Sequence, residues 1–515
     1  MPMPSSERDI VVIGGGTNGL ACAARLAKSG RRVTLLEAAE TCGGGASTVE
    51  FAPGYRVSGL AHVLNMLDRR VAGELQLSRH GLTLAEADMA TTALGQQPLT
   101  IRRGRAEGLD ATDALAWDEL YRRLDRFAGL LAPFREMTPP RLSRKAGNDF
   151  KGLARMGLDL RRMGRAETRE LLRVFLINVA DLLEDDLSDD RLKGLVAFDA
   201  TLGSWLGPRS PNSLLPLLNR MAGEAGGQRG ALALPKGGMG ALAEAMVAAA
   251  TGAGVTIRTG ARVAAIRVAD DRAAGLTLDT GEEIAAGLVV SAISPQATLR
   301  QLAGPAHLDT GTLRQVRGIK SRGAAAKLHL ALAGAPDFGG ADLRHRLVIA
   351  PSVDAVERAF NPVKYGEVPE RPVMEIVIPS AHDAGFAPDG HHVLSAIVQY
   401  APHAPADREA ARAAMLENTL AVLEDHAPGL RGLIRHAEIL MPWDIEQRYG
   451  LAGGNWHSAE LTVEQMLFLR PFHGAAQYES PLPGLWLAGA GSHPGGGISG
   501  ASGWNAAGRI LGGRA

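Results

Sequence analysis

Near its start the chain carries a strand, a glycine turn, a helix and a second strand in close succession. Residues 11–38 read VVIGGGTNGLACAARLAKSGRRVTLLEA. The apolar run over residues 9–13 predicts a short buried strand, and the pattern over residues 17–29 predicts a helix that stops before Gly30. Residues 32–36 are expected to form the second strand. This order predicts a βαβ unit of a Rossmann-like α/β domain.

The glycines between the first strand and the helix have the spacing G-x-G-x-x-G. Gly14 allows a sharp turn, Gly16 lets the backbone approach a pyrophosphate, and Gly19 lets the helix pack closely on the strand. Thr17 and Asn18 begin the helix, whose free N–H groups and positive dipole end favour phosphate. In a chain with 63 glycines one triplet could be a simple turn. The elements around it favour a dinucleotide site.

Glu37 ends the second strand of this unit. An acid at this place accepts hydrogen bonds from the 2′-hydroxyl of a ribose. It would repel a 2′-phosphate, so the sequence favours a dinucleotide without one.

A second glycine cluster follows Glu37 after five residues. Gly43, Gly44 and Gly45 precede Ser47, which gives the pattern E-x5-G-G with a hydroxyl residue shortly after. This pattern resembles the extended fingerprint of FAD enzymes in the amine-oxidase and phytoene-desaturase group. Backbone N–H groups of such a loop can approach the phosphate and ribityl region of the flavin. The alternative is a flexible loop without a ligand.

A glycine-rich segment lies at the far end of the chain. Residues 483–510 read PGLWLAGAGSHPGGGISGASGWNAAGRI, which predicts a strand over 485–488, a loop, and a helix from about Ser502. In the related desaturases such a segment covers the ribityl chain and pyrimidine edge of the flavin, where hydrogen-bond donors favour hydride acceptance. By this resemblance the residues placed there are Gly491, Ser492, Gly497 and Ile498.

A third segment, between these two, completes the resemblance. An alanine-rich helix over residues 241–250 precedes strands within 255–268 and 275–291. In the family this stretch returns the chain to the nucleotide domain, and the residue matching Val263 lies beside the adenine. The chain thus resembles the phytoene-desaturase-like FAD oxidoreductases, which include carotenoid desaturases, carotenoid isomerases and retinol saturases.

The resemblance implies two discontinuous domains. An FAD-binding, Rossmann-like domain is expected from residues 1–70, 230–295 and 476–515. Residues 71–229 and 296–475 are expected to form a mixed α+β substrate lobe with a helical portion, in which prolines interrupt the helices of the first range.

Composition excludes several other classes of protein. The 515 residues include 55 Lys or Arg and 55 Asp or Glu, so no overall charge attracts nucleic acid. Cys22 and Cys42 form no C-x-x-C motif, so redox-active disulfide chemistry is not expected, and Cys42 is interpreted as a packed side chain. No signal peptide, membrane span or second dinucleotide motif is recognised, and a cytoplasmic location is expected.

One basic stretch suggests a peripheral membrane contact. Residues 141–173 contain ten Lys or Arg and four acids. A basic amphipathic helix can lie on an anionic membrane. The alternative is a stripe that faces the core and a solvated basic back. The stripe consists of Leu153, Met156, Leu160 and Met163.

Three histidines are candidates for the one proton that the reaction must handle. His457 follows a G-G-N segment that resembles one near the family's substrate cavity, and His493 and His62 lie beside the two glycine loops. Histidine titrates near neutrality, which suits acid–base catalysis. Each could equally be a structural residue, and Glu460 and Arg470 are candidate orienters. No metal cluster or Ser-His-Asp set is recognised.

The resemblance implies desaturation or dehydrogenation of a hydrophobic small molecule, with hydride transfer to flavin N5 and electrons leaving to oxygen or a quinone. A redox-neutral isomerase or a saturase is one alternative. An amine oxidase is another, although aromatic residues make up only 4% of the chain. A flavin-binding scaffold that acts through a protein partner is a third. The substrate, the electron acceptor and the oligomeric state stay open.

Overall fold

The computed structural model describes residues 9–140 and 149–512. At its centre is a five-stranded parallel sheet with the strand order β12-β2-β1-β16-β22. The first two strands have the predicted bounds, and the α/β, Rossmann-like fold class is confirmed. The strands come from distant parts of the chain: β1 (Asp9–Ile13), β2 (Arg32–Leu36), β12 (Thr256–Arg258), β16 (Leu288–Ser291) and β22 (Leu485–Leu487).

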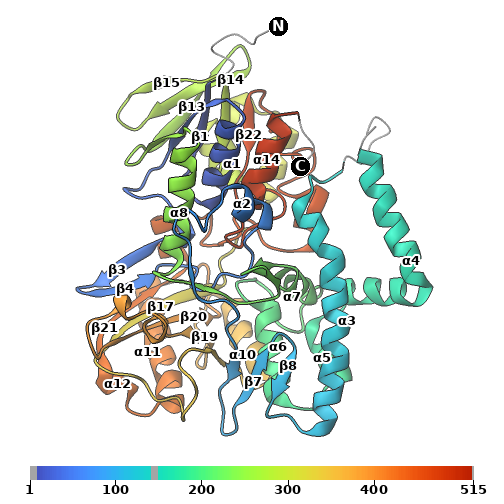
Figure 1. The fold of residues 1–515 in the computed structure, drawn as a ribbon, viewed down its shortest axis with the longest axis vertical. Helices are drawn as coiled ribbons and strands as arrows, with labels where there is room; N and C mark the ends of the chain where they lie inside the picture. Colours follow the sequence, from blue (N-terminus) through green and yellow to red (C-terminus); the bar gives the residue numbers. More distant parts are fainter. Residues whose placement is uncertain (1–8, 141–148, 513–515) are drawn as a thin grey trace.

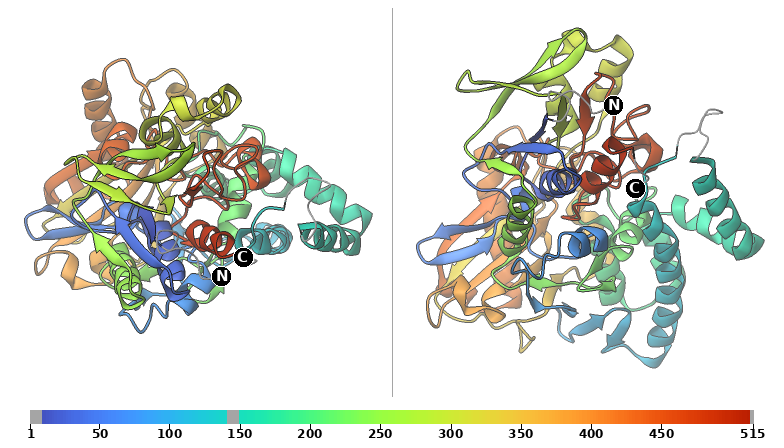
Figure 2. Two further views of the ribbon diagram at one scale, coloured as in Figure 1. Left: turned by 90° about the horizontal axis from the view of Figure 1, so that it is seen from above. Right: turned by 45° about the horizontal axis from the view of Figure 1, so that its top comes forward.

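The parallel sheet is covered on both faces, which explains why its strands are continuous apolar runs. Ile10 and Val12 of β1 belong to the core on the helical side, and Val11 and Ile13 belong to the core on the other side. Figures 1 and 2 show the helices packed beside the sheet. The helices are α1 (Thr17–Lys28), α8 (Met239–Gly252) and α14 (Ala501–Ile510), and the opposite layer is β13 (Val263–Ala269), β14 (Arg272–Leu278) and β15 (Glu283–Ala285).

A second, eight-stranded sheet lies at the other end of the molecule (Figure 1). Its neighbouring strands are antiparallel except for the parallel pair β18 and β6. The sequence pattern predicts three of its strands, over residues 324–331, 373–378 and 392–399, each within one residue of the observed bounds. In spatial order they are β21 (Ile434–Leu440), β17 (Ala325–Leu332), β20 (His392–Gln399), β19 (Val373–Val377), β18 (Arg346–Ile349), β6 (Thr91–Ala93), β7 (Leu99–Arg102) and β8 (Arg105–Glu107).

Helices gather beside this sheet, together with a few short strands. The larger helices are α3 (Ala111–Glu136), α5 (Val179–Asp186), α6 (Asp190–Thr201), α7 (Leu214–Met221), α10 (Val353–Val363), α11 (Arg408–His426) and α13 (Pro442–Tyr449). Of the smaller helices, α12 (Leu430–Leu433) also packs here, whereas α2 (Arg69–Glu74) and α9 (Thr310–Gly318) pack in the two cores of the parallel sheet. Short strands outside the large sheets are β3 (Thr48–Ala52), β4 (Tyr55–Ser58), β5 (Leu84–Glu86), β9 (Glu224–Ala225), β10 (Gln228–Arg229) and β11 (Leu234–Pro235).

Two expectations for residues 70–230 were wrong in detail. This region also contains the strands β5 to β10, which are too short to show a clear alternation in the sequence. Pro133 lies inside α3, close to its end, and does not interrupt it. A proline near the end of a helix removes only one backbone hydrogen bond, and the other contacts of this long helix keep it intact.

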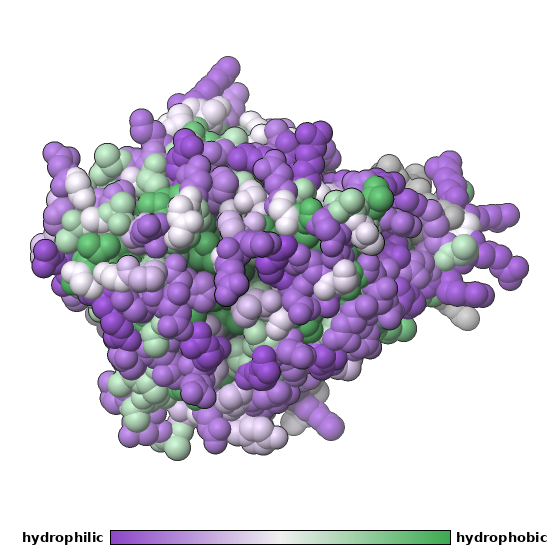
Figure 3. All heavy atoms as spheres, turned by 90° about the horizontal axis from the view of Figure 1, so that it is seen from below, coloured by the Kyte–Doolittle hydropathy of each residue, from purple (hydrophilic) through white to green (hydrophobic). Residues whose placement is uncertain are grey.

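The basic stretch forms an arm, α4 (Asp149–Leu176), that projects from the body (Figures 1 and 3). Gly164, with φ +83°, separates two helical parts. Leu158, Leu172 and Leu176 are exposed on it. The side chains of the predicted apolar stripe lie outside the described residues, so membrane contact stays a prediction. None of the described helices is long and apolar enough to cross a bilayer.

Candidate active site

A cavity of about 1030 Å³ lies between the parallel sheet and the eight-stranded sheet and is lined by residues of both parts. The structure brings to its wall most of the residues that the sequence predicted for the cofactor. These are Gly14, Gly16, Thr17, Asn18, Glu37, Gly43, Gly44, Gly45, Ser47, Val263, Gly497 and Ile498.

The start of α1 offers hydrogen-bond donors to this cavity. Gly16 is the N-cap and has no side chain to satisfy the first-turn N–H groups. The second glycine loop lies alongside, since the N–H of Gly43 donates to the carbonyl of Gly15 at 2.9 Å. These features fit a bound diphosphate.

Three predicted residues support the site from behind and do not line the cavity. A Cβ atom on Gly19 would lie 1.9 Å from the carbonyl oxygen of Gly14, so this glycine allows α1 to pack on β1, as predicted. A Cβ atom on Gly491 would lie 2.3 Å from Cδ of Pro295. The hydroxyl of Ser492 donates to the carbonyl of Leu487 at 3.2 Å. Gly491 and Ser492 therefore shape the loop, and their contact with the flavin stays a prediction.

Glu37 follows β2 and faces the cavity, and its contact with a ribose stays a prediction. Its carboxylate accepts hydrogen bonds from the N–H groups of Gly15 at 2.6 Å and Ala39 at 2.9 Å, and it faces the cavity. The Sγ atom of Cys42 packs against Gly15, where a Cβ atom would meet it at 2.6 Å. Burial raises the pKa of the Cys42 thiol to about 11, so the thiol stays protonated. It is a packed side chain, as interpreted.

The glycine-rich segment near the end of the chain, residues 483–510, places a strained residue at the cavity wall. Gly497 has φ +120°, and a Cβ atom on it would lie 2.3 Å from Sδ of Met66. Ile498 has φ +57° although it is β-branched, and it lines the cavity. Such a conformation costs energy and persists where the surroundings enforce it, commonly at functional sites.

His457 lines the cavity, and its surroundings favour the neutral imidazole. Its Nε2 accepts a hydrogen bond from the indole N–H of Trp456 at 3.1 Å, and its Nδ1 has no partner among the described residues. Burial, with Arg470 and Arg135 nearby, lowers the pKa of His457 to about 3. The ring is therefore neutral at physiological pH, with its proton on Nδ1. It can donate a hydrogen bond, whereas its predicted acid–base role near neutrality lacks support.

The other two histidines also have depressed pKa values. His493 does not line the cavity, and its Nε2 lies 2.6 Å from the carbonyl oxygen of Phe134. Burial lowers the pKa of His493 to about 4, which fits a structural role. His62 does line the cavity, but burial and the nearby Lys327 lower its pKa to about 4. Neither titrates near neutrality, because both are withdrawn from water.

Of the two candidate orienters, Arg470 contacts His457 and Glu460 does not. Glu460 pairs with Arg322 at 2.8 Å. Arg470 is fully buried and joins the segment around His457 to the loop that follows β22. Its guanidinium donates to carbonyl oxygens of His457, Ala459, Glu460, Gln465, Ala490 and Ser492.

Comparison with known proteins agrees with this site. Residues 19–511 match the family described as flavin containing amine oxidoreductase. The chain belongs to this family. Its cofactor is therefore FAD, and the enzyme is a flavin-dependent oxidoreductase. The resemblance to phytoene-desaturase-like flavoproteins is confirmed.

Two relatives and one solved structure resemble this oxidoreductase over almost their whole length. Pyridine nucleotide-disulfide oxidoreductase domain-containing protein 2 of Rattus norvegicus is 29% identical, with 97% of this chain and 93% of that protein covered. Hydroxyneurosporene desaturase of Cereibacter sphaeroides is 30% identical, with 95% and 94% covered. The crystal structure of an oxidoreductase from Methanosarcina mazei has the same fold, with a TM-score of 0.63, 19% identity, and 98% and 99% covered.

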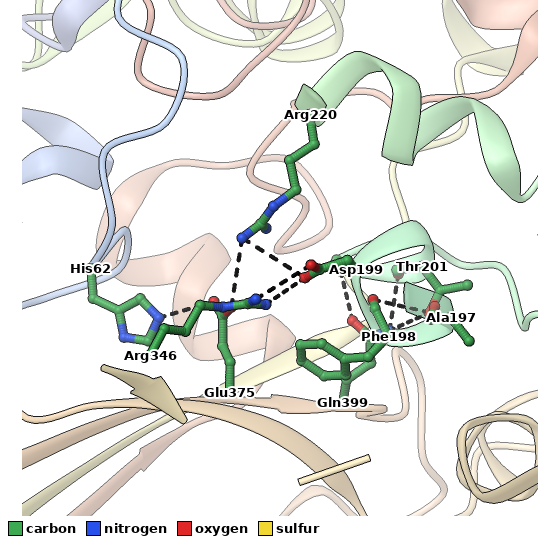
Figure 4. Close-up of polar contacts among 10 residues, drawn as sticks. His62, Ala197, Phe198, Asp199, Thr201, Arg220, Arg346, Glu375 and Gln399 are labelled. Atoms are coloured by element: carbon green, nitrogen blue, oxygen red, sulfur yellow. Dashed lines mark hydrogen bonds and ion pairs between the residues drawn. The ribbon is translucent and has the colours of Figure 1, made fainter. Parts of the chain in front are cut away.

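The sequence did not reveal a buried charged network at the other end of the cavity of this oxidoreductase. Arg346 is fully buried between the carboxylates of Glu375 and Asp199, and Arg220 approaches the same carboxylates from α7 (Figure 4). Lys327 lies on β17, which β20 separates from the strand of Glu375, and is buried as well. The available signal was a charge inside an apolar strand, as in VMEIV around Glu375. Among the described residues there is no group of three or more side chains suited to a metal.

Proposed function

We propose that this flavin-dependent oxidoreductase dehydrogenates or desaturates a largely apolar small molecule. The observation that carries the proposal is the single cavity, which extends from Gly16 and Glu37 to Arg220 and Glu375. Cofactor and substrate would therefore share one enclosed space. The printed name of the relative hydroxyneurosporene desaturase supports the same reaction class.

The described residues fit a reaction in which the protein positions a C–H bond. When bound, FAD accepts a hydride at N5. The apolar wall that would hold the substrate includes Leu202, Pro216 and Ile397. His457 would serve as a fixed donor, because its Nδ1–H has no other described partner. The second hydrogen leaves as a proton to solvent, and oxygen or a quinone takes the electrons.

A peripheral contact with a membrane through residues 141–173 belongs to this proposal. A lipophilic substrate partitions into bilayers, so a basic arm that rests on an anionic surface would bring the cavity close to it. The exposed Leu158, Leu172 and Leu176 on α4 support this contact.

Product analysis tests the proposed reaction against its alternatives. The purified holoenzyme is incubated with polyenes and saturated analogues in the presence of oxygen or a quinone, and products are identified by mass spectrometry. Loss of two hydrogens supports dehydrogenation. An unchanged mass with altered geometry would indicate an isomerase, and a gain of two hydrogens a saturase. Peroxide formed from amines alone would indicate an amine oxidase, and no turnover with any substrate would favour a scaffold.

A further inference from the structure

The buried network at the substrate end of the cavity has two carboxylates whose hydrogen-bonding needs are already met. Glu375 accepts from Nε of Arg346 at 2.5 Å and is hydrogen-bonded to Nε2 of His62 at 3.0 Å. Asp199 accepts from the other side of the Arg346 guanidinium at 2.5 Å. The Arg346 guanidinium thus donates charge-assisted hydrogen bonds to both carboxylates, and such bonds are stronger than those between neutral groups.

Arg220 is left without a hydrogen bond in this arrangement. Its guanidinium lies 3.9 Å from Asp199 and 4.0 Å from Glu375, too far for a hydrogen bond, and no other described residue accepts from it. It lines both the main cavity and a side pocket of about 110 Å³. The close-up shows it reaching from α7 toward the two acids (Figure 4).

The other unmet groups at this end are also donors. The buried Nζ of Lys327 has no hydrogen-bond partner among the described residues, although it does not line the cavity and so adds charge to this end without a direct contact to a ligand. Asn219 lines the cavity next to Arg220, and its oxygen already accepts from Arg135 at 2.5 Å, which leaves its amide N–H₂. Because the unmet groups named here are all N–H donors, a ligand that binds them must carry hydrogen-bond acceptors.

The charges here are also unbalanced. Arg220 and Arg346 supply two cationic groups, and Lys327, whose pKa burial lowers to about 7, adds part of a third at neutral pH. Against them stand two carboxylates, those of Asp199 and Glu375. Burying a charge without a counter-charge is costly, so an anionic group would complete the set. An amine would be repelled, and a pure hydrocarbon would leave the guanidinium of Arg220 without a hydrogen bond.

We infer that Arg220 binds a carboxylate of the substrate, which is then an apolar molecule with an acidic end. This inference rests on the proposed function, because it assigns a substrate class to the same cavity. The diphosphate of FAD does not explain Arg220. The turn that fits the diphosphate lies between β1 and α1, whereas Arg220 of α7 lies beside Asp199 of α6 and Glu375 of β19 (Figure 4).

Binding of three head groups on one chain tests this inference. Laurate, lauryl alcohol and laurylamine are titrated into the FAD-loaded protein by calorimetry. We expect laurate to bind at least about tenfold more tightly than the other two. In R220Q the Kd for laurate should rise by about tenfold, while the Kd for lauryl alcohol should change by less than about twofold. R220K, which keeps the charge, should retain part of the preference, and R371Q, a surface control paired with Asp425, should keep all of it.

Equal affinity for the three ligands in the unchanged protein would overturn the inference, even if R220Q failed to fold. So would a preference for laurate that R220Q retains. A head-group preference without any flavin reduction would contradict the proposed function and leave the inference standing. Turnover of neutral hydrocarbons, together with equal affinity for the three head groups, would support the proposed function and contradict the inference.

Discussion

Trp456 donates its indole N–H to Nε2 of His457 at 3.1 Å, and this bond decides where the imidazole carries its proton. The neutral ring must then be protonated on Nδ1, which has no partner among the described residues and lies where a Cβ atom on Gly496 would meet it at 2.8 Å. His457 is thus a donor fixed at the cavity wall.

Replacing His457 by glutamine should therefore preserve most of the activity. A glutamine keeps an N–H donor and cannot titrate, so we expect kcat/KM to fall by less than about fivefold, whereas H457L should lose about tenfold because a hydrogen bond is removed. The pH profile of H457Q between pH 5 and 8 should match that of the unchanged enzyme. A pH dependence that disappears in H457Q would restore the acid–base role.

Removing the carboxylate of Glu37 should weaken FAD binding. The carboxylate holds the Gly15 N–H at 2.6 Å and faces the cavity, and charge-assisted hydrogen bonds of this kind are worth about 1.5–3 kcal/mol. We expect E37A to raise the Kd for FAD by about tenfold or more, measured by fluorescence of the released flavin. E40A is the matched control, since Glu40 is exposed and outside the cavity wall. Equal retention of FAD in E37A and E40A would contradict this role.

The protein should lose stability as the pH falls from about 6.5 to 4. The pKa values of His62, His457 and His493 are lowered to about 4, 3 and 4, so the unfolded chain binds more protons in this window. Each histidine contributes up to about 1.4 kcal/mol per pH unit. Urea unfolding at pH 5 and 7 measures how steeply the free energy of unfolding falls with pH, and H493Q should make this pH dependence smaller. An identical slope in H493Q would show that His493 is not buried in its neutral form.

Replacing Lys327 by methionine should stabilise the fold. Burial lowers the pKa of Lys327 to about 7 from its usual 10.5, so the unfolded state binds the proton more tightly. The increase in the free energy of unfolding caused by K327M should be largest below pH 7 and should shrink as the pH rises toward 10. We expect about 2 kcal/mol or more at pH 7 by urea unfolding. K320M, at an exposed ion pair with Glu464, should change little, and a K327M protein less stable than K320M would refute the expectation.

The sequence predicted the nucleotide part of the fold well because glycines mark its boundaries. Gly14 and Gly30 both have positive φ, and the strands and helix they separate lie within one residue of the predicted bounds. Buried parallel strands also appear as continuous apolar runs, as in Asp9–Ile13. Family membership and FAD followed from the same motifs.

The substrate end could not be predicted in this way. Arg346 and Asp199 are 147 residues apart in the chain and meet only through the fold. The protonation state of His457 depends on its burial and on Trp456, Arg470 and Arg135, which no local pattern reports. The division into two domains stays a prediction, although the parallel sheet does take its strands from three separate segments.

Anaerobic titration of the flavin tests the central claim most directly. The purified protein should be yellow, and its visible band should bleach on addition of an apolar substrate without oxygen and recover when oxygen or a quinone is admitted. Recovery with a dehydrogenated product would establish a flavin-dependent dehydrogenase. A flavin that no apolar substrate bleaches, or a protein that cannot be loaded with FAD, would contradict the account.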